Sequence, residues 1–170
     1  MMKSLCIVYV SKSGNTKKLA SYLNSQLSGP DLDVEEIEIK PKKMPGILMA
    51  AVASGKQREL PITNTDLDLG KYDFLLFGAP IWNKKPAPFL KTFVNQAKNI
   101  NGKNAAFFLT HAAAVGKNMQ ANLVFKENLE RQGVNVIESW LSVRMKKGNM
   151  KDGQQDQDID AFVKTIRSHL

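Results

Sequence analysis

Hydrophobic and polar residues follow two different patterns along the chain, which separate predicted strands from predicted helices. Apolar stretches typical of buried or half-buried strands occur at 4–10, 32–39, 72–78, 104–110 and 134–143. Apolar residues recur every three or four positions, as in helices, at 15–27, 86–98, 118–132 and 158–169. This alternation predicts one α/β domain over residues 1–170, with a five-stranded parallel sheet and helices on both faces.

Two segments do not fit this alternation. Residues 40–61 are more than a simple crossover needs, and within them the apolar stretch 47–53 predicts a short helix. We favour a packed surface helix there, and a mobile flap beside a ligand site is the alternative. The polar stretch 144–156 is expected to be flexible and exposed.

A loop rich in hydroxyl groups joins the first predicted strand to the first predicted helix. Backbone N–H groups and the positive end of the helix dipole meet at such a junction and favour an anion. An ordinary helix cap explains one or two polar residues, but it explains a cluster of five less well. We therefore predict phosphate binding by the loop, in which the glycine lets the backbone bend closely around the anion. Its residues are Ser11, Lys12, Ser13, Gly14, Asn15 and Thr16.

The loop lacks the glycine spacing of a Walker loop and two of the three glycines of a Rossmann fingerprint. It resembles the phosphate loop of flavodoxins, Thr/Ser-x-Thr/Ser-Gly-x-Thr/Ser. The four constrained positions are met by Ser11, Ser13, Gly14 and Thr16. The resemblance implies a flavodoxin-like three-layer sandwich with strand order 2-1-3-4-5. It also implies FMN as cofactor, with its phosphate held by this loop.

A second loop follows the third predicted strand and resembles the Gly-x-Pro-x-aromatic loop of flavodoxin-like FMN proteins. A flavin ring needs an apolar face to lie on and backbone groups at its edges. Trp82 can supply that face, or it can pack on the following helix as part of the core. With the phosphate loop at the same end of the sheet, the flavin interpretation is favoured. The predicted ring-binding residues here are Ala79, Pro80, Ile81, Trp82 and Asn83.

The third loop at this edge begins with Thr110, His111 and Ala112 and continues to residue 117. Flavodoxin-like proteins often carry glycines or a second aromatic here, whereas this chain has alanines and no aromatic. One face of the flavin is therefore expected to be open to a substrate. His111 can hydrogen-bond the ring or a substrate, although a single histidine after a strand is more often a surface residue.

The chain is basic, with 24 Lys and Arg against 16 Asp and Glu, a formal net charge of +8. Such a surface attracts anionic small molecules, anionic lipid or nucleic acid. No nucleic-acid-binding motif accompanies the charge, and the lysines are scattered in pairs, so we predict no nucleic-acid partner. Cys6 lies inside the first strand and is expected to be a buried, inert thiol. No signal-peptide pattern or long apolar run is present, and a cytoplasmic location is expected.

The function predicted from this resemblance is electron transfer through bound FMN, with no catalytic side chain and no metal ligand assigned. The partner is then a redox protein or a small, quinone-like acceptor, with NAD(P)H as a further candidate. One alternative is an FMN-dependent reductase or dehydrogenase acting on quinone-like acceptors, including a protoporphyrinogen-oxidase-like activity, with peripheral membrane contact. The other alternative is a flavodoxin fold that no longer binds FMN.

Overall fold

The computed structural model describes residues 2–112, 119–146, 149–150 and 155–170. Within these ranges the chain forms seven strands and five helices. The strands are β1 (Lys3–Tyr9), β2 (Leu32–Glu38), β3 (Phe74–Trp82), β4 (Lys85–Pro86), β5 (Asn104–His111), β6 (Asn135–Lys146) and β7 (Asn149–Met150). The helices are α1 (Asn15–Leu27), α2 (Ile47–Gly55), α3 (Phe89–Gln96), α4 (Met119–Glu130) and α5 (Gln155–Ser168).

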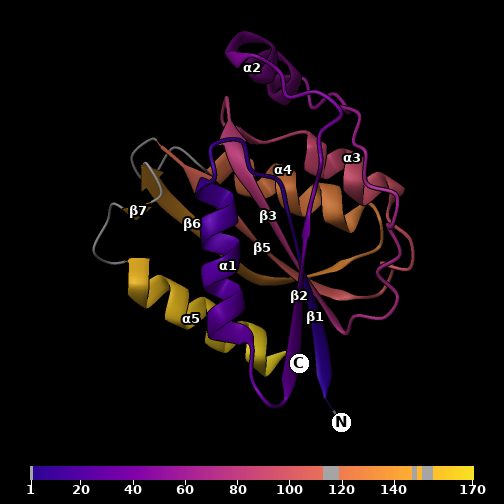
Figure 1. Ribbon diagram of the computed structural model, residues 1–170, viewed down its shortest axis with the longest axis vertical. Coiled ribbons are helices and arrows are strands. Elements are labelled where there is room, and N and C mark those ends of the chain that lie inside the picture. The colour runs from indigo at the N-terminus through magenta and orange to yellow at the C-terminus, as the bar shows by residue number, and fades with distance from the viewer. Residues whose placement is uncertain (1, 113–118, 147–148, 151–154) are drawn as a thin grey trace.

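The elements form three layers, with α1 and α5 on one face of the sheet and α3 and α4 on the other (Figure 1). Each interface contains its own buried apolar cluster, one including Phe162 of α5 and the other Phe125 of α4. Successive strand residues point to opposite faces, so Phe107 and Phe108 of β5 belong to different clusters. The predicted α/β layering is confirmed. No helix in the described ranges is long and apolar enough to cross a membrane.

The five long strands are parallel and lie in the order β2-β1-β3-β5-β6, the order that the flavodoxin resemblance implied. The predicted number of five strands was wrong, because β7 pairs antiparallel with β6 and β4 pairs antiparallel with β3. Each added strand has two residues. A strand of that length is too short to produce a hydrophobic period in the sequence.

The β3–β4 hairpin replaces most of the second predicted loop. β3 continues through Trp82, and the chain turns at Asn83 and Lys84, whose φ angles of 48° and 62° suit a type I′ turn. Pro86 pairs in β4 rather than opening a helix, and α3 begins only at Phe89. The hairpin therefore raises a short two-stranded ribbon above the carboxyl edge of the sheet (Figure 1).

The polar stretch expected to be flexible and exposed is also partly strand. β6 runs to Lys146, with Met145 buried, and pairs there with β7. The expectation of an exposed stretch was therefore wrong at Met145 and at Gln155, the buried first residue of α5, whereas Lys146 and Asn149 are exposed as expected. Residues 147–148 and 151–154 lie outside the described ranges.

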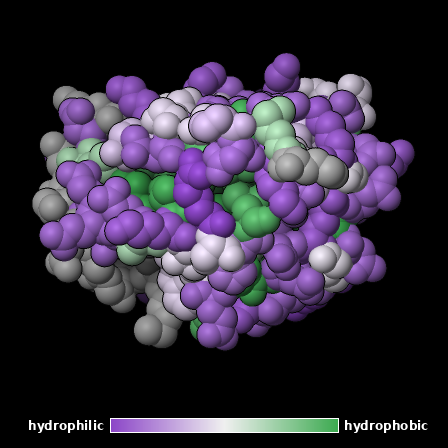
Figure 2. Space-filling view, turned by 90° about the horizontal axis from the view of Figure 1, so that it is seen from below, coloured by the Kyte–Doolittle hydropathy of each residue, from purple (hydrophilic) through white to green (hydrophobic). Residues whose placement is uncertain are grey.

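The opposite end of the molecule, where the strands begin, is viewed in Figure 2 and is mainly hydrophilic around a smaller apolar area. Polar links close this end of the sheet. The Ser4 N–H donates to the Asp73 carboxylate at 2.8 Å, and the Lys103 ammonium donates to the Gly70 carbonyl at 3.0 Å. The loops predicted to bind a ligand lie at the other end.

Gly78 allows two central strands to pack around the ring of Phe108. A Cβ atom at Gly78 would overlap that ring. We expect Gly78→Ala to lower the free energy of unfolding by about 1–3 kcal/mol, because the surrounding core must shift to admit the methyl group. Urea denaturation of Gly78→Ala, of Phe108→Leu and of the double variant Gly78→Ala/Phe108→Leu tests whether the overlap causes the loss of stability. The double variant should lose less free energy of unfolding than the two single variants lose together, because the smaller side chain leaves room for the methyl group. Losses that simply add would contradict the overlap.

Cys6 is fully buried, and burial raises the pKa of its thiol to about 12. Because the thiolate is the reactive form, native protein should not react with a thiol reagent at mildly alkaline pH. The same protein in concentrated urea should react at once with one thiol per chain. Modification of the native protein faster than it unfolds would contradict this assignment.

Candidate functional site

The pairing of β1, β3 and β5 brings the three predicted loops to one edge of the sheet. In the parallel register Tyr9 lies opposite Gly78, and Pro80 lies opposite Thr110. The Val10 N–H extends the first pairing by donating to the Gly78 carbonyl at 3.1 Å. The chain leaves all three strands at the upper edge in Figure 1, beside the amino end of α1.

The loop between β1 and α1 is shaped by Gly14, which has φ of 84° and caps the helix. No side chain caps α1 at this residue, and no acidic residue occupies its first turn. The Lys17 N–H donates to the Ser11 hydroxyl at 3.3 Å, and Ser13 is exposed. A Cβ atom built on Gly14 would meet no atom within 4 Å. Open space beside Gly14 thus adjoins the positive end of the helix dipole and the hydroxyl-bearing residues Ser11 and Ser13, which suits a phosphate group.

Thr16 is placed differently from the exposed hydroxyl groups of the loop. It is buried, and its Oγ1 lies 2.8 Å from Oγ1 of Thr110, which is also buried. This hydrogen bond ties the first loop to the third across the end of β3. The Thr16 side chain therefore holds two predicted site segments together beneath the loop surface.

Trp82 contacts both the core and the predicted site. Its ring meets that of Phe89 edge to face, with centroids 6.2 Å apart and planes at 84°. The ammonium of Lys12 lies 5.4 Å from the centroid of the same ring. The two interpretations of Trp82 thus describe different parts of one half-buried side chain. A flat ligand that lies on this face of the Trp82 ring must displace the Lys12 ammonium or share the face with it.

The hairpin also carries α2, the helix predicted within residues 40–61. The buried Ser54 hydroxyl donates to the Trp82 carbonyl at 2.5 Å, and the Lys85 ammonium donates to the Gly55 carbonyl at 2.8 Å. At the other end of the segment, the Lys12 ammonium donates to the Pro45 carbonyl at 3.0 Å. The packed surface helix is confirmed, and it lies over the hairpin above the sheet edge (Figure 1).

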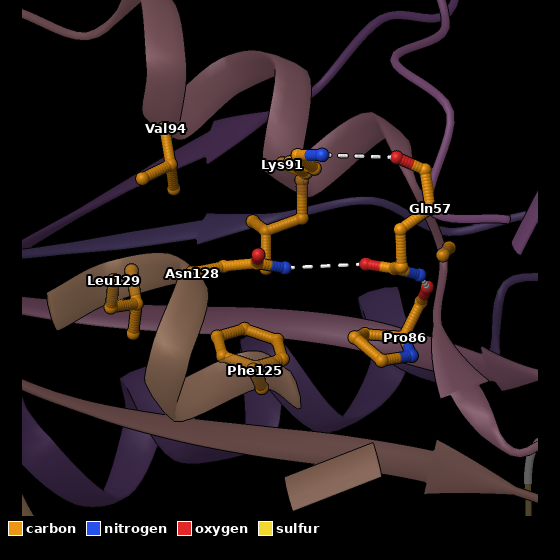
Figure 3. Close-up of a pocket in the computed structure, with 9 residues that line it drawn as sticks. Gln57, Pro86, Lys91, Val94, Phe125, Asn128 and Leu129 are labelled. Carbon is orange, nitrogen blue, oxygen red and sulfur yellow. Dashed lines mark hydrogen bonds between the residues drawn. The ribbon is translucent and has the colours of Figure 1, made fainter. Parts of the chain in front are cut away.

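Gln57 fixes the chain just after α2. Its backbone carbonyl accepts from the Lys91 ammonium at 3.0 Å, and its side-chain oxygen accepts from the Asn128 amide at 3.2 Å (Figure 3). With Phe125 and Pro86 it borders a cavity of about 10 Å³. Such a cavity has room for about one water molecule and none for a flavin. It is a packing defect between α3, α4 and β4 and lies apart from the loop cluster.

The third segment places His111 inside the protein. His111 is buried at the end of β5, contrary to the expectation of a surface residue, and lies opposite Arg144 in the β5–β6 pairing. The Nε of Arg144 donates to the Ala112 carbonyl at 3.3 Å. Residues 113–117, which were predicted to complete this loop, lie outside the described ranges.

Arg144 lies at the same sheet edge as the predicted site, and sequence reasoning missed it because residues 144–156 were expected to be flexible and exposed. The signal was present: a single arginine at the end of the fifth predicted strand belongs to the same sheet edge as the other loops. Lys12 and Arg144 supply positive charge there. The nearby acid Glu38 is paired with Lys17 at 2.8 Å, and this hydrogen bond raises the pKa of Lys17. The edge suits an anionic ligand with a flat aromatic part.

Comparisons with known proteins agree with this fold. A flavoprotein from Lactobacillus acidophilus, solved in complex with FMN, is 27% identical, with a TM-score of 0.64 over 95% of this chain and 99% of that one. Oxidised flavodoxin 2 and flavodoxin 1 from Bacillus cereus share the fold, with TM-scores of 0.67 and 0.65 at 20% and 19% identity. The alignments cover 99% of this chain and 100% and 99% of those chains. The search of curated proteins gave no match.

The model of one protein family matches residues 2–148, which include all three loops. That family is described as NADPH-dependent FMN reductase. The match and the Lactobacillus flavoprotein support FMN as the cofactor. This chain belongs to the NADPH-dependent FMN reductase family and has a flavodoxin-like fold.

Proposed function

We propose that the protein is an FMN-dependent oxidoreductase that takes two electrons from NAD(P)H and delivers them to a small acceptor of the quinone class. The observation that carries the proposal is the family match over residues 2–148. Lys12, which follows β1, and Arg144 of β6 support it, because they place positive charge at this sheet edge and a nicotinamide dinucleotide brings several phosphate charges to it.

The phosphate of FMN is assigned to the loop between β1 and α1. Ser11 and Ser13 supply hydroxyl groups, and the backbone around Gly14 supplies N–H groups at the amino end of α1. Asn15 adds a side-chain amide. Thr16 supports the loop from below through Thr110. Lys12 adds a positive charge where flavodoxins mostly use neutral donors.

The ring is assigned to the space between the hairpin and the end of β5. Trp82 and Ile81 are half-buried on the hairpin and offer apolar surface. Backbone groups near Ala79, Pro80 and Asn83 can meet the ring edges, as can those of the segment Thr110–Ala112. This last segment carries no aromatic side chain, which leaves room for a nicotinamide or an acceptor to approach. Bound FMN supplies hydride acceptance and electron release, and the chain positions it.

The reductase assignment is tested by anaerobic mixing of FMN-loaded protein with NADPH. The visible flavin absorption should disappear, and it should return when a soluble quinone is added. Flavin that stays oxidised with NADPH but exchanges electrons with a redox protein would instead indicate a carrier. Loss of all flavin on gel filtration would indicate that FMN is a substrate or is not bound.

Gly14→Val tests the phosphate loop. A β-branched residue at φ of 84° is strained, so the loop must move and FMN affinity should fall by at least about tenfold. Gly102→Val is the matched control, because Gly102 has φ of 76°, equal open space around its Cβ position and a place at the opposite end of the sheet. Fluorescence titration with FMN should show normal affinity for the control. Equal FMN affinities in the two variants would show that this loop does not bind the phosphate.

The net charge of +8 gives a prediction for the redox potential. The flavin hydroquinone is an anion, so a cationic protein should stabilise it. We therefore expect a hydroquinone couple less negative than that of acidic flavodoxins. The difference should shrink with added salt, because the Debye length falls to about 3 Å at 1 M. Redox titration at two ionic strengths measures both effects, and a strongly negative, salt-independent potential would contradict the prediction.

A further inference from the structure

The amino end of α2 is an exposed apolar tip. Ile47, Leu48 and Met49 expose 86%, 77% and 57% of their surface, and Met44 just before them is also exposed. The described residues include eight exposed large hydrophobic side chains, and these four lie within six positions. Scattered single residues of this kind are ordinary, but a contiguous group marks an interaction surface.

The tip is held in place by the fold. Ala50, Ala53 and Ser54 form the buried side of α2, and the Asn83 amide donates to the Ala51 carbonyl at 3.2 Å. The Ser54, Lys85 and Lys12 contacts described above fix both ends of the segment to the hairpin and the phosphate loop. Folding the tip down onto the sheet edge would break these contacts. The apolar side chains therefore point away from the body of the protein, as α2 does in Figure 1.

Basic residues flank the tip on both sides in the sequence. Residues 40–58 contain five basic residues and no acidic residue: Lys40, Lys42, Lys43, Lys56 and Arg58. All five are exposed, as is Lys84 at the turn of the adjoining hairpin. Exposed apolar side chains in a segment that is otherwise rich in exposed cations complement an anionic lipid surface, where headgroups meet the lysines and acyl chains accept the apolar groups.

We propose that the α2 tip docks the protein on the surface of an anionic phospholipid bilayer. Ile47 and Leu48 enter the boundary of the acyl chains, and Lys42, Lys43 and Lys56 contact the phosphate headgroups. A second copy of the chain is a poorer occupant, because tip-to-tip contact would bring ten positive charges together. Docking goes beyond the reductase assignment and does not depend on it. It would also place the sheet edge near acceptors dissolved in the membrane.

The test is cosedimentation with vesicles, without NADPH. Vesicles of equal parts phosphatidylglycerol and phosphatidylcholine should bind the protein. Vesicles of pure phosphatidylcholine should bind it at least about tenfold more weakly. Ile47→Ser/Leu48→Ser should lower binding by about tenfold or more. Leu123→Ser, which changes a side chain 58% exposed on α4, is the matched control and should bind normally. These positions are exposed, so the variants should keep the circular dichroism of the native fold.

The charge contribution is tested in the same assay. Lys42→Gln/Lys43→Gln should weaken binding by about tenfold, whereas Lys98→Gln/Lys164→Gln, which removes two exposed charges elsewhere, should have a smaller effect. Wild-type protein that stays in solution with anionic vesicles at low salt would overturn the proposal. So would equal binding by the tip variant and the control. A wild-type dimer that binds no vesicles and becomes monomeric in the tip variant would identify a subunit interface instead.

Discussion

The parallel pairing of β1, β3 and β5 is the constraint on which the rest of this structure depends. It brings segments that are about seventy and a hundred residues apart to one sheet edge, where hydroxyl groups, a tryptophan and a buried histidine lie on neighbouring segments. The Thr16–Thr110 hydrogen bond then links the outer two segments from below. A shift in the register of any of the three strands would separate these segments and break this hydrogen bond, because the end of each strand carries its loop.

The β3–β4 hairpin is the second organising element. One short ribbon presents Trp82 to the site, packs its ring edge on Phe89 and supports α2 through the hydroxyl of Ser54. Lys12 contacts both Trp82 and the segment before α2, so the phosphate loop, the hairpin and the helix above it share contacts. A cofactor that displaced Lys12 from Trp82 would therefore alter the attachment of α2 as well as the site.

Charge is distributed unevenly around the sheet. Three glutamates lie on the edge strand β2, where Glu35 accepts hydrogen bonds from Lys71 and Tyr72 that lower the pKa of its carboxyl group. The carboxyl edge is instead bordered by Lys12, Arg144 and the basic segment around α2. Anionic ligands are therefore attracted to the edge at which the loops meet. The protein as a whole is basic, so this local pattern also acts at longer range when salt is low.

The sequence by itself determined the number and order of the long elements along the chain and the place of the first loop. Strand and helix periods extend over many residues, and the pattern of Ser11, Ser13, Gly14 and Thr16 is local. The order of strands came from a family resemblance, because periodicity does not say which strands are neighbours. Only the tertiary structure decided the β4 hairpin, the burial of His111 and the inward role of Thr16. The burial of His111 and of Thr16 depends on contacts between residues far apart in the chain, and such contacts leave no period in the sequence. The hairpin is local, but a two-residue strand is too short to produce a period.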